Sequence, residues 1–362
     1  MGLLKRYRGT GADPLFGFPV RAHSGVAMEG YFWRITDPDT GRVLIALCGA
    51  NRGPQGQWAT VGLASWPNGF LRTGAFDGAW TDPKRLGVCG GTEDRVFEGD
   101  ERRLRVDLGP DARLDLTFDE LVPWPLRSLG GSSVFHMIPG LNQYWHPWLL
   151  GGKASGTAVV GDTVMQFAGA EVYGEKNWGR EGFPEAWWWG QAQGFADTGA
   201  CVAFAGGLVT AGPMKVEVTG LVVRLPDGRV FRLGNPVVSP VRTTSGDEWW
   251  RLSGRGYGWR VEVEASAPLD QAFVLPVPLP SEHRNVAGDL EHLVGDLTVR
   301  VWRFGREVWA GTSALAALEH GGLERARAEL LRRRLDASVT SAGPARLPYG
   351  FVDGTESGTS FS

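Results

Sequence analysis

Short segments in which apolar and polar residues alternate, separated by glycine-containing turns, constrain the fold of this 362-residue chain more than any other feature. Residues 103–108 alternate with period two, turn at 109–111 and resume the alternation over 113–118. Alternation places successive side chains on opposite faces of a strand, and closely spaced short strands are typical of antiparallel sheets rather than βαβ units. The same pattern flanks turns at 37–41, 161–162 and 226–228. The sequence therefore predicts an all-β chain that folds as an antiparallel barrel or sandwich.

The length of the chain allows two domains of ordinary size, each with its own core. We expect two all-β halves, at 18–140 and 141–322. A helix is predicted at 323–337, where residues of high helix propensity combine with apolar residues at helical spacing. Residues 338–362 end in a stretch of Gly, Ser and Thr, and we expect them to form a flexible tail.

Charge and cysteine content argue against several classes of function. The net charge is −3 at pH 7, so no large basic surface for a nucleic acid is expected. Cys48, Cys89 and Cys201 are far apart in the sequence, and the six histidines are scattered. This spacing argues against a disulfide framework and against a zinc site.

Nothing in the sequence indicates a membrane-spanning segment. The N-terminal residues contain no apolar run of signal-peptide length. The uncharged run at residues 199–214 is rich in glycine and shorter than the ~20 residues that cross a bilayer. We therefore expect a cytoplasmic protein, and peripheral contact with a membrane stays open.

Tryptophan is unusually abundant, with sixteen residues, and polar side chains gather beside the indoles in three clusters. Indole rings can build aromatic-rich β cores, and they can also line a ligand cavity. The first cluster spans 23–34 and the second spans 142–148. The third cluster joins the polar turn at 173–179 to the aromatic segment at 183–191.

Each cluster also has a purely structural interpretation. Glu29 and Arg34 could form a buried pair across a strand. His146, which precedes a proline, could be a hydrogen-bonded turn residue. Glu175 and Lys176 could form an exposed ion pair that adds almost nothing to stability. The third cluster nevertheless favours a functional site, because a short charged turn flanked by tryptophans has little packing reason to be so polar.

Several of these segments resemble the signatures of the tocopherol cyclase family. The most specific is Glu175-Lys176-Asn177-Trp178-Gly179, within residues 170–179. A more distant likeness, over 152–179, is to the carotenoid 1,2-hydratase group. The resemblance implies two lipocalin-like β-barrels packed together. It is also carried by 29–34, 183–191, 313–322 and the early His23-Ser24-Gly25.

The resemblance implies a reaction as well as a fold. Cyclases of this family close a prenylated quinol to a chromanol: a proton adds to an alkene, and the phenol oxygen captures the tertiary cation. An alkene is a very weak base, so the donor must be a neutral acid in a dry cavity. Burial keeps a carboxyl group protonated near neutral pH, and indole faces stabilise a cation when water is excluded. Such a reaction requires no metal ion and no redox cofactor.

On this resemblance the substrate is a hydrophobic small molecule, a prenylated quinol or related isoprenoid, and Glu175 is the expected proton donor. Lys176 and Asn177 would orient the donor or the substrate oxygen. Tyr173, His146 and His23 are candidate proton relays or bases. The residues expected to bind substrate are Trp178, Trp187, Trp188, Trp189, Gln191, Trp145, Tyr144, Glu29, Tyr31 and Trp33.

Two alternatives stay open at this point. The scaffold could act as a hydratase or a pericyclase on another isoprenoid or polyene. It could also be a non-catalytic carrier of a lipid or quinone, since lipocalin-like barrels bind small apolar molecules.

Overall fold

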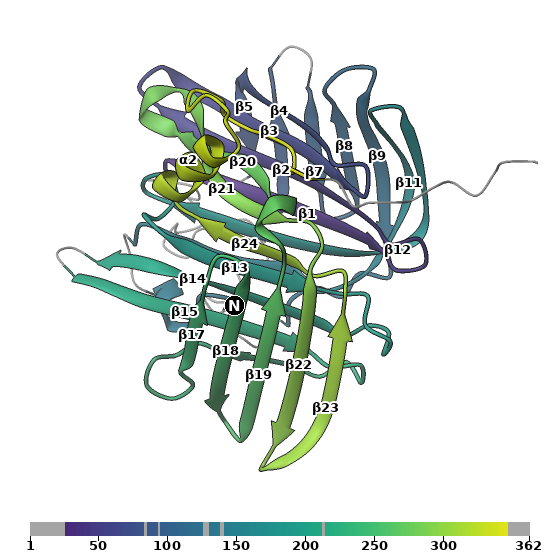
Figure 1. Cartoon of the computed structure of the whole chain (residues 1–362), viewed down its shortest axis with the longest axis vertical. Helices are drawn as coiled ribbons and strands as arrows, with labels where there is room; N and C mark the ends of the chain where they lie inside the picture. The colour runs from purple at the N-terminus through teal and green to yellow at the C-terminus, as the bar shows by residue number, and fades with distance from the viewer. Residues whose placement is uncertain are drawn as a thin grey trace, which may run out of the picture.

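The computed structural model describes residues 26–82, 85–92, 95–125, 130–137, 141–211 and 214–346. His23 and residues 347–362 lie outside this part of the chain. The described strands form three antiparallel sheets, and one α-helix lies near the C-terminal end (Figure 1). The prediction of an all-β, lipocalin-like protein with a short C-terminal helix is therefore confirmed.

The first sheet contains twelve strands in the order β4-β3-β2-β1-β12-β11-β9-β8-β7-β6-β5, and β10 pairs with β12 outside this path. The sheet curves so that β5 and β6 contact β2 and β3, while the end strands β4 and β5 are not hydrogen-bonded to each other. It is thus an open barrel. Its strands are β1 (Met28–Asp37), β2 (Arg42–Gly53), β3 (Gly56–Trp66), β4 (Phe70–Asp77), β5 (Ala79–Thr81), β6 (Gly87–Gly90), β7 (Phe97–Asp100), β8 (Arg103–Asp107), β9 (Ala112–Asp119), β10 (Tyr144–Leu149), β11 (Lys153–Val160) and β12 (Thr163–Gly179).

Alternation in the sequence determines which residues fill the core of the first sheet. Every second residue of β9 is buried and those between are exposed, as the period-two pattern predicts. Strands β1 and β12 instead carry buried residues on both faces over much of their length. They pair in register from Met28–Gly179 to Thr36–Glu171 and so bring two of the polar and aromatic clusters side by side.

The second half forms a seven-stranded sheet, β16-β15-β14-β13-β24-β21-β20, and a five-stranded sheet, β17-β18-β19-β22-β23. A core that includes Phe204, Leu221, Trp250 and Val263 packs between them. The strands are β13 (Trp187–Ala192), β14 (Cys201–Ala211), β15 (Met214–Arg224), β16 (Val230–Leu233), β17 (Val241–Ser245), β18 (Trp249–Gly256), β19 (Trp259–Ser266), β20 (Phe273–Leu279), β21 (Arg284–His292), β22 (Asp296–Arg303), β23 (Arg306–Ser313) and β24 (Ala317–Gly321). In the described part of the chain, 3₁₀ turns lie at Ser133–Met137, Leu269–Gln271 and Pro280–Glu282.

The C-terminal helix, α2 (Leu323–Arg332), lies beside β20 and β21 (Figure 1). Its buried Ala326 and Leu330 pack on Val274 and Leu290. The helix ends earlier than the predicted residue 337, since Arg334 has a left-handed backbone with φ of 62°. Residues 338–346, which were predicted to belong to a flexible tail, return along β20, where Ala342 bridges to Val274.

The change from the first sheet to the second falls between β12 and β13, after Gly179. Strands β11 and β12 therefore pair with the N-terminal strands β9 and β1, and β10 joins the same sheet through β12, although all three follow the predicted division at residue 140. The division of the chain into two domains stays a prediction. The consequence for the site is that β12 and β13, which are consecutive in the chain, belong to different sheets.

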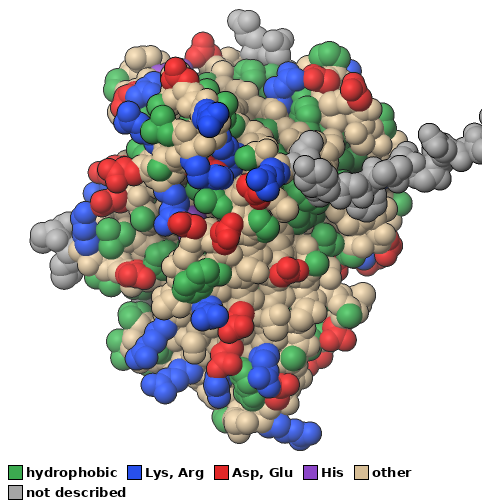
Figure 2. Space-filling view, viewed as in Figure 1, with side chains coloured by type: hydrophobic (Ala, Val, Ile, Leu, Met, Phe, Trp, Pro, Cys, Tyr) green, Lys and Arg blue, Asp and Glu red, His purple; other side chains and the backbone are tan. Residues whose placement is uncertain are grey.

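The surface seen in Figure 2 mixes Lys and Arg with Asp and Glu, and no patch of one sign dominates that face. None of the helices in the described residues is long and apolar enough to cross a membrane.

Candidate active site

A cavity of about 170 Å³ lies between the first sheet and the seven-stranded sheet. Strands β1, β2, β10 and β12 line it from one side, and β13, β14, β15, β20, β21 and β24 line it from the other. Four acidic residues reach its wall, and no Lys, Arg or His does so among the described residues. The aromatic residues that border it are Tyr31, Phe32, Tyr144, Trp145, Phe183, Trp187, Trp188 and Trp189.

Glu175 lies on this wall, near the end of β12, and its side chain is almost completely enclosed, with 6% of its surface exposed. Three donors converge on one of its oxygens. The indole Nε1 groups of Trp145 and Trp189 each donate to Oε2 at 2.8 Å, and the Tyr173 hydroxyl donates to it at 2.7 Å. Oε1 accepts no hydrogen bond from the described residues. A proton on this carboxyl group therefore sits on Oε1.

Burial and hydrogen bonding act on Glu175 in opposite directions. Burial raises the pKa of its carboxyl group to about 6, and the three donors oppose that rise because they favour the charged form. The group is therefore neutral at a higher pH than an exposed carboxyl. Its conjugate base is nonetheless held by three preorganised donors, which is the arrangement that stabilises a carboxylate left behind by proton transfer.

Lys176 follows Glu175 in sequence but points to the other face of β12, because neighbouring strand residues alternate. Its Nζ forms an ion pair with Glu29 at 2.9 Å and lies 4.8 Å from the centroid of the Tyr31 ring. Glu29 also pairs with Arg52 at 2.8 Å. The side chains of Lys176 and Glu29 are both fully buried. The interpretation of Glu175 and Lys176 as an exposed ion pair is therefore wrong.

Arg34 also differs from its structural interpretation, because it does not pair with Glu29. The two residues are five positions apart on β1 and face opposite sides of the strand. The guanidinium donates to Thr36 at 2.6 Å, to Gln191 at 2.9 Å and to the carbonyl oxygen of Leu293 at 3.1 Å. The hydrogen bond from Arg34 to Gln191 thus joins the first sheet to the seven-stranded sheet.

The structure brings together most of the residues that were predicted to bind substrate. Tyr31, Tyr144, Trp145, Trp187, Trp188, Trp189 and Asn177 border the cavity with Glu175. Tyr173 is fully buried and contacts Glu175 directly. The Oδ1 atom of Asn177 is buried and accepts no hydrogen bond in the described structure. It is therefore available to a ligand in the cavity.

Other predicted residues do not line the cavity. Trp33 packs on Phe97 and Trp148 in the first core. Trp178 stacks on Tyr144 at 5.5 Å between ring centroids. His146 packs edge-on against Trp124. The remaining residues of this group are Glu29, Lys176 and Gln191, whose contacts are given above.

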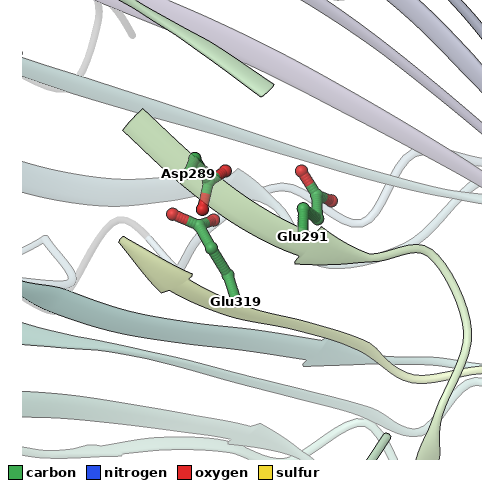
Figure 3. A group of neighbouring side chains, drawn as sticks. All are labelled: Asp289, Glu291 and Glu319. Atoms are coloured by element: carbon green, nitrogen blue, oxygen red, sulfur yellow. The ribbon is translucent and has the colours of Figure 1, made fainter. Parts of the chain in front are cut away.

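Asp289, Glu291 and Glu319 form a second acidic group on the cavity wall, which the sequence analysis missed (Figure 3). Glu291 and Glu319 lie directly opposite each other on β21 and β24, and Asp289 is two residues from Glu291 on the same face. One carboxylate oxygen of each lies within 4.8 Å of the others. Among the described residues, this is the group that could hold a metal ion. The sequence signal for this group is the pair of acidic residues Asp289 and Glu291, which are separated by one residue on a strand.

The pKa values of this acidic group are raised. Burial raises the pKa of Glu319 to about 7, although the Trp187 indole, which donates to its Oε1, opposes that rise. Burial, together with the negative charge of Glu319, holds the pKa values of Asp289 and Glu291 well above their usual range. The described ion pairs include none of the three carboxyl groups, although the charge of Arg34 opposes the rise in the pKa of Glu291.

A curved antiparallel fold around an acid-bearing aromatic cavity defines a lipocalin-like protein that can enclose a small apolar molecule. Residues 131–322 match the tocopherol cyclase-like family, and the chain belongs to that family. The match includes β10, β12, β13, β21 and β24, which carry Glu175, the indole donors and the second acidic group.

Solved structures share this fold at low sequence identity. CghA aligns with a TM-score of 0.56 and 15% identity, covering 83% of this chain and 89% of that one. CghA with Sch210972 gives a TM-score of 0.52 and 14% identity, with coverage of 82% and 88%. Kievitone hydratase from Nectria haematococca gives 0.50 and 12%, with coverage of 85% and 92%. A comparison with curated protein sequences gives no match. Similarity at this level establishes the common fold.

Replacing Trp145 with Phe is expected to raise the pKa of Glu175 above 6, because the carboxylate loses one of its three donors. A hydrogen bond to a charged group contributes about 1.5–3 kcal/mol, so the titration midpoint should move up by about one pH unit or more. Infrared spectroscopy of the protonated carboxyl C=O stretch measures the midpoint, and a Glu175→Gln variant assigns the band. Trp188→Phe is the matched control, since the Trp188 indole donates to Thr219 instead. Equal midpoints in the two variants would contradict the prediction.

Proposed function

We propose that this protein is a cofactor-independent cyclase that acts on a prenylated quinol or a related isoprenoid, with Glu175 as the proton donor. The observation that carries the proposal is the position of Glu175: it lies on the wall of an aromatic cavity, with three donors on Oε2 and Oε1 free of hydrogen bonds from the described residues. The family supports a reaction of the cyclase type.

In the proposed reaction, the O–H bond of Glu175 breaks and its proton forms a new C–H bond on the less substituted alkene carbon. The other alkene carbon becomes a tertiary cation. A phenol oxygen of the same substrate then forms the C–O bond and loses its proton. Atoms and electrons balance without an oxidant or reductant, because the product is an isomer of the substrate. This balance is the reason for proposing a reaction that is independent of redox cofactors.

The surrounding residues suit each step of this reaction. The Trp145 and Trp189 indoles and the Tyr173 hydroxyl stabilise the Glu175 carboxylate after it has released its proton. The ring faces that border the cavity can stabilise the cation, by roughly 2 kcal/mol or more each in a dry site. Asn177 offers its Oδ1 to a substrate hydroxyl group. Tyr173 acts through Glu175 and is a positioning residue.

Lys176 and His146, which were also predicted to be catalytic, do not line the cavity. Lys176 is held by Glu29 on the far face of β12, so any effect on the reaction would be indirect. His146 contacts Trp124 and His136 rather than the cavity wall. A relay through His146 stays a prediction, as does a role for His23, which lies outside the described residues.

A hydratase is the second candidate, because kievitone hydratase has the same fold. Water containing both ²H and ¹⁸O distinguishes the reactions when a prenylated hydroquinone is incubated with the protein under argon. A cyclase product gains one solvent hydrogen and no solvent oxygen, whereas a hydratase product gains both and a pericyclase product gains neither. Mass spectrometry of the product reads the outcome. A ligand that binds and returns unlabelled and unchanged would overturn the cyclase proposal and favour a carrier.

A further inference from the structure

The second acidic group has a geometry that fits a specific task in the cavity. We infer that Asp289 and Glu319 form a carboxyl pair that shares one proton, binds the hydroxyl group of a phenolic substrate and accepts the proton which that hydroxyl loses. The acceptance of the proton rests on the proposed cyclase function. The recognition of the hydroxyl group does not, and it identifies the substrate class as hydroxylated aromatic compounds.

The carboxyl groups of Asp289 and Glu319 lie close to each other. The two groups face each other in Figure 3, and one oxygen of each lies within 4.8 Å of the other. Two ionised carboxylates that are buried this close together repel each other strongly. One of the two groups is therefore protonated, as in other carboxyl pairs that share a site. Burial and the neighbouring carboxylates hold the pKa of Asp289 well above its usual range, so Asp289 can carry this proton.

Two oxygen atoms of the second acidic group are available to a ligand. Asp289 Oδ1 and Glu291 Oε1 are buried and have no hydrogen-bond partner among the described residues, and both residues border the cavity. Their side chains are more than nine-tenths buried. A buried polar atom without a partner costs free energy unless a ligand or water satisfies it. These atoms are therefore available to a polar group of a ligand in the cavity.

Strand β13 links the carboxyl pair to Glu175. Trp187 and Trp189 lie on the same face of β13, and their indoles donate to Glu319 and Glu175, respectively. Glu319 is also the cross-strand neighbour of Trp189. The negative charge of Glu175 contributes to the raised pKa of Glu319. A proton donor and a proton acceptor thus border the same cavity from different sheets.

Charged groups on three strands act on the second acidic group. The negative charge of Glu291, on β21, raises the pKa of Asp289, and that of Glu175, on β12, raises the pKa of Glu319. Arg34, on β1, acts on Glu291, but its hydrogen bonds go elsewhere. Glu319, whose pKa is raised to about 7, becomes the accepting carboxylate as the pH rises through 7.

Over one turnover, the protein takes up as many protons as it releases. Glu175 gives its proton to the alkene carbon and becomes a carboxylate. The C–O bond forms, the phenol O–H bond breaks, and that proton passes to Glu319. After the product leaves, Glu319 releases a proton to water and Glu175 takes one up, so the protein returns to its starting state. The reaction therefore needs a substrate that carries a hydroxyl group next to the prenylated carbon of its ring.

The test uses two ligands that cannot react: an alkylhydroquinone with a saturated chain, and its dimethyl ether. Quenching of tryptophan fluorescence measures both dissociation constants. The wild-type protein is expected to prefer the hydroquinone by about tenfold or more, the effect of a hydrogen bond to a charged acceptor. The Asp289→Asn/Glu319→Gln double variant should lose at least about fivefold of this preference. Glu171→Gln is the control, since Glu171 accepts a hydrogen bond from the Gly194 backbone and does not line the cavity.

A pH series separates this role from a purely structural one. In a Glu175→Gln background, which removes the titration of Glu175, the preference for the hydroquinone should increase between pH 5 and 8 as Glu319 ionises. Adding the double substitution should make the preference independent of pH. Circular dichroism and thermal melting confirm that each variant is folded. If the double variant does not fold, the pH series in the Glu175→Gln protein alone decides, and a flat profile overturns the inference.

Three outcomes would overturn the inference: equal affinity for the two ligands in the wild-type protein, an unchanged preference in the double variant, or a preference that requires added Mg²⁺ or Ca²⁺. The last would show that the three carboxyl groups bind a cation. If the wild-type protein prefers the hydroquinone but forms no cyclised product from a prenylated hydroquinone, the proposed function fails and the hydroxyl-binding role stands.

Discussion

Turnover should fall by at least about 10³-fold when Glu175 is replaced with Gln, because the amide has no proton acidic enough to add to an alkene. Gln has the same shape, and its carbonyl oxygen can accept the hydrogen bonds from Trp145, Trp189 and Tyr173 that now reach Oε2. The variant should therefore keep its fold and its affinity for an unreactive alkylhydroquinone. Loss of turnover without loss of binding would assign a chemical step to this residue.

Chromatographic detection of the cyclised product from a prenylated hydroquinone under argon measures the effect. Glu171→Gln serves again as the control, because it removes a carboxyl group from the same strand outside the cavity. Activity of the Glu175→Gln variant within about tenfold of the wild-type value would remove Glu175 from the mechanism. A loss of binding equal to the loss of turnover would instead indicate a role in holding the ligand.

The second large effect concerns stability. Replacing Glu29 with Gln should lower the free energy of unfolding by about 3–5 kcal/mol, the usual cost of removing one partner of a buried ion pair. Lys176 would keep its charge in a fully buried position without its carboxylate, and Arg52 would lose the same partner. Urea denaturation followed by fluorescence measures the change.

The matched control for this prediction is Glu185→Gln, which breaks an exposed ion pair with Lys215. Exposed pairs contribute about 0–1 kcal/mol, so the two variants should differ clearly. Similar losses in both would mean that the Lys176–Glu29 pair is not essential to the packing between β1 and β12. A large loss for Glu29→Gln would explain why the motif contains a lysine that does not reach the cavity.

Much of the fold could be predicted from the sequence because it depends on local patterns. Residues 103–118 form the hairpin β8–β9 that their alternation predicts. The helix was predicted correctly at its start, Leu323, because propensity and apolar spacing agree there. The end of the helix was not predicted correctly, because helix propensity does not indicate that Arg334 adopts a left-handed backbone. The sheet to which β10–β12 belong depends on long-range pairing, which no local pattern encodes.

The site was predicted only in part, for reasons that also follow from the strands. Glu175 and the indoles of Trp145 and Trp189 come from the polar and aromatic clusters, so their proximity could be inferred. Lys176 was grouped with Glu175 although the pleat of a strand sends adjacent side chains to opposite faces. Asp289 and Glu319 are far apart in sequence and meet because β21 pairs with β24, which the sequence alone did not reveal.

The hydrogen bonds to Oε2 of Glu175 have a stereochemical consequence. With that oxygen occupied, the acidic hydrogen is attached to the other oxygen, and the direction of its approach is fixed by the orientation of the carboxyl plane on β12. A substrate bound between the two sheets would then receive the hydrogen on one face of its double bond. The carbon that gains the hydrogen becomes a CH2 group, so reaction in ²H₂O would place deuterium in one of its two positions, and NMR of the product would report the geometry of this carboxyl group.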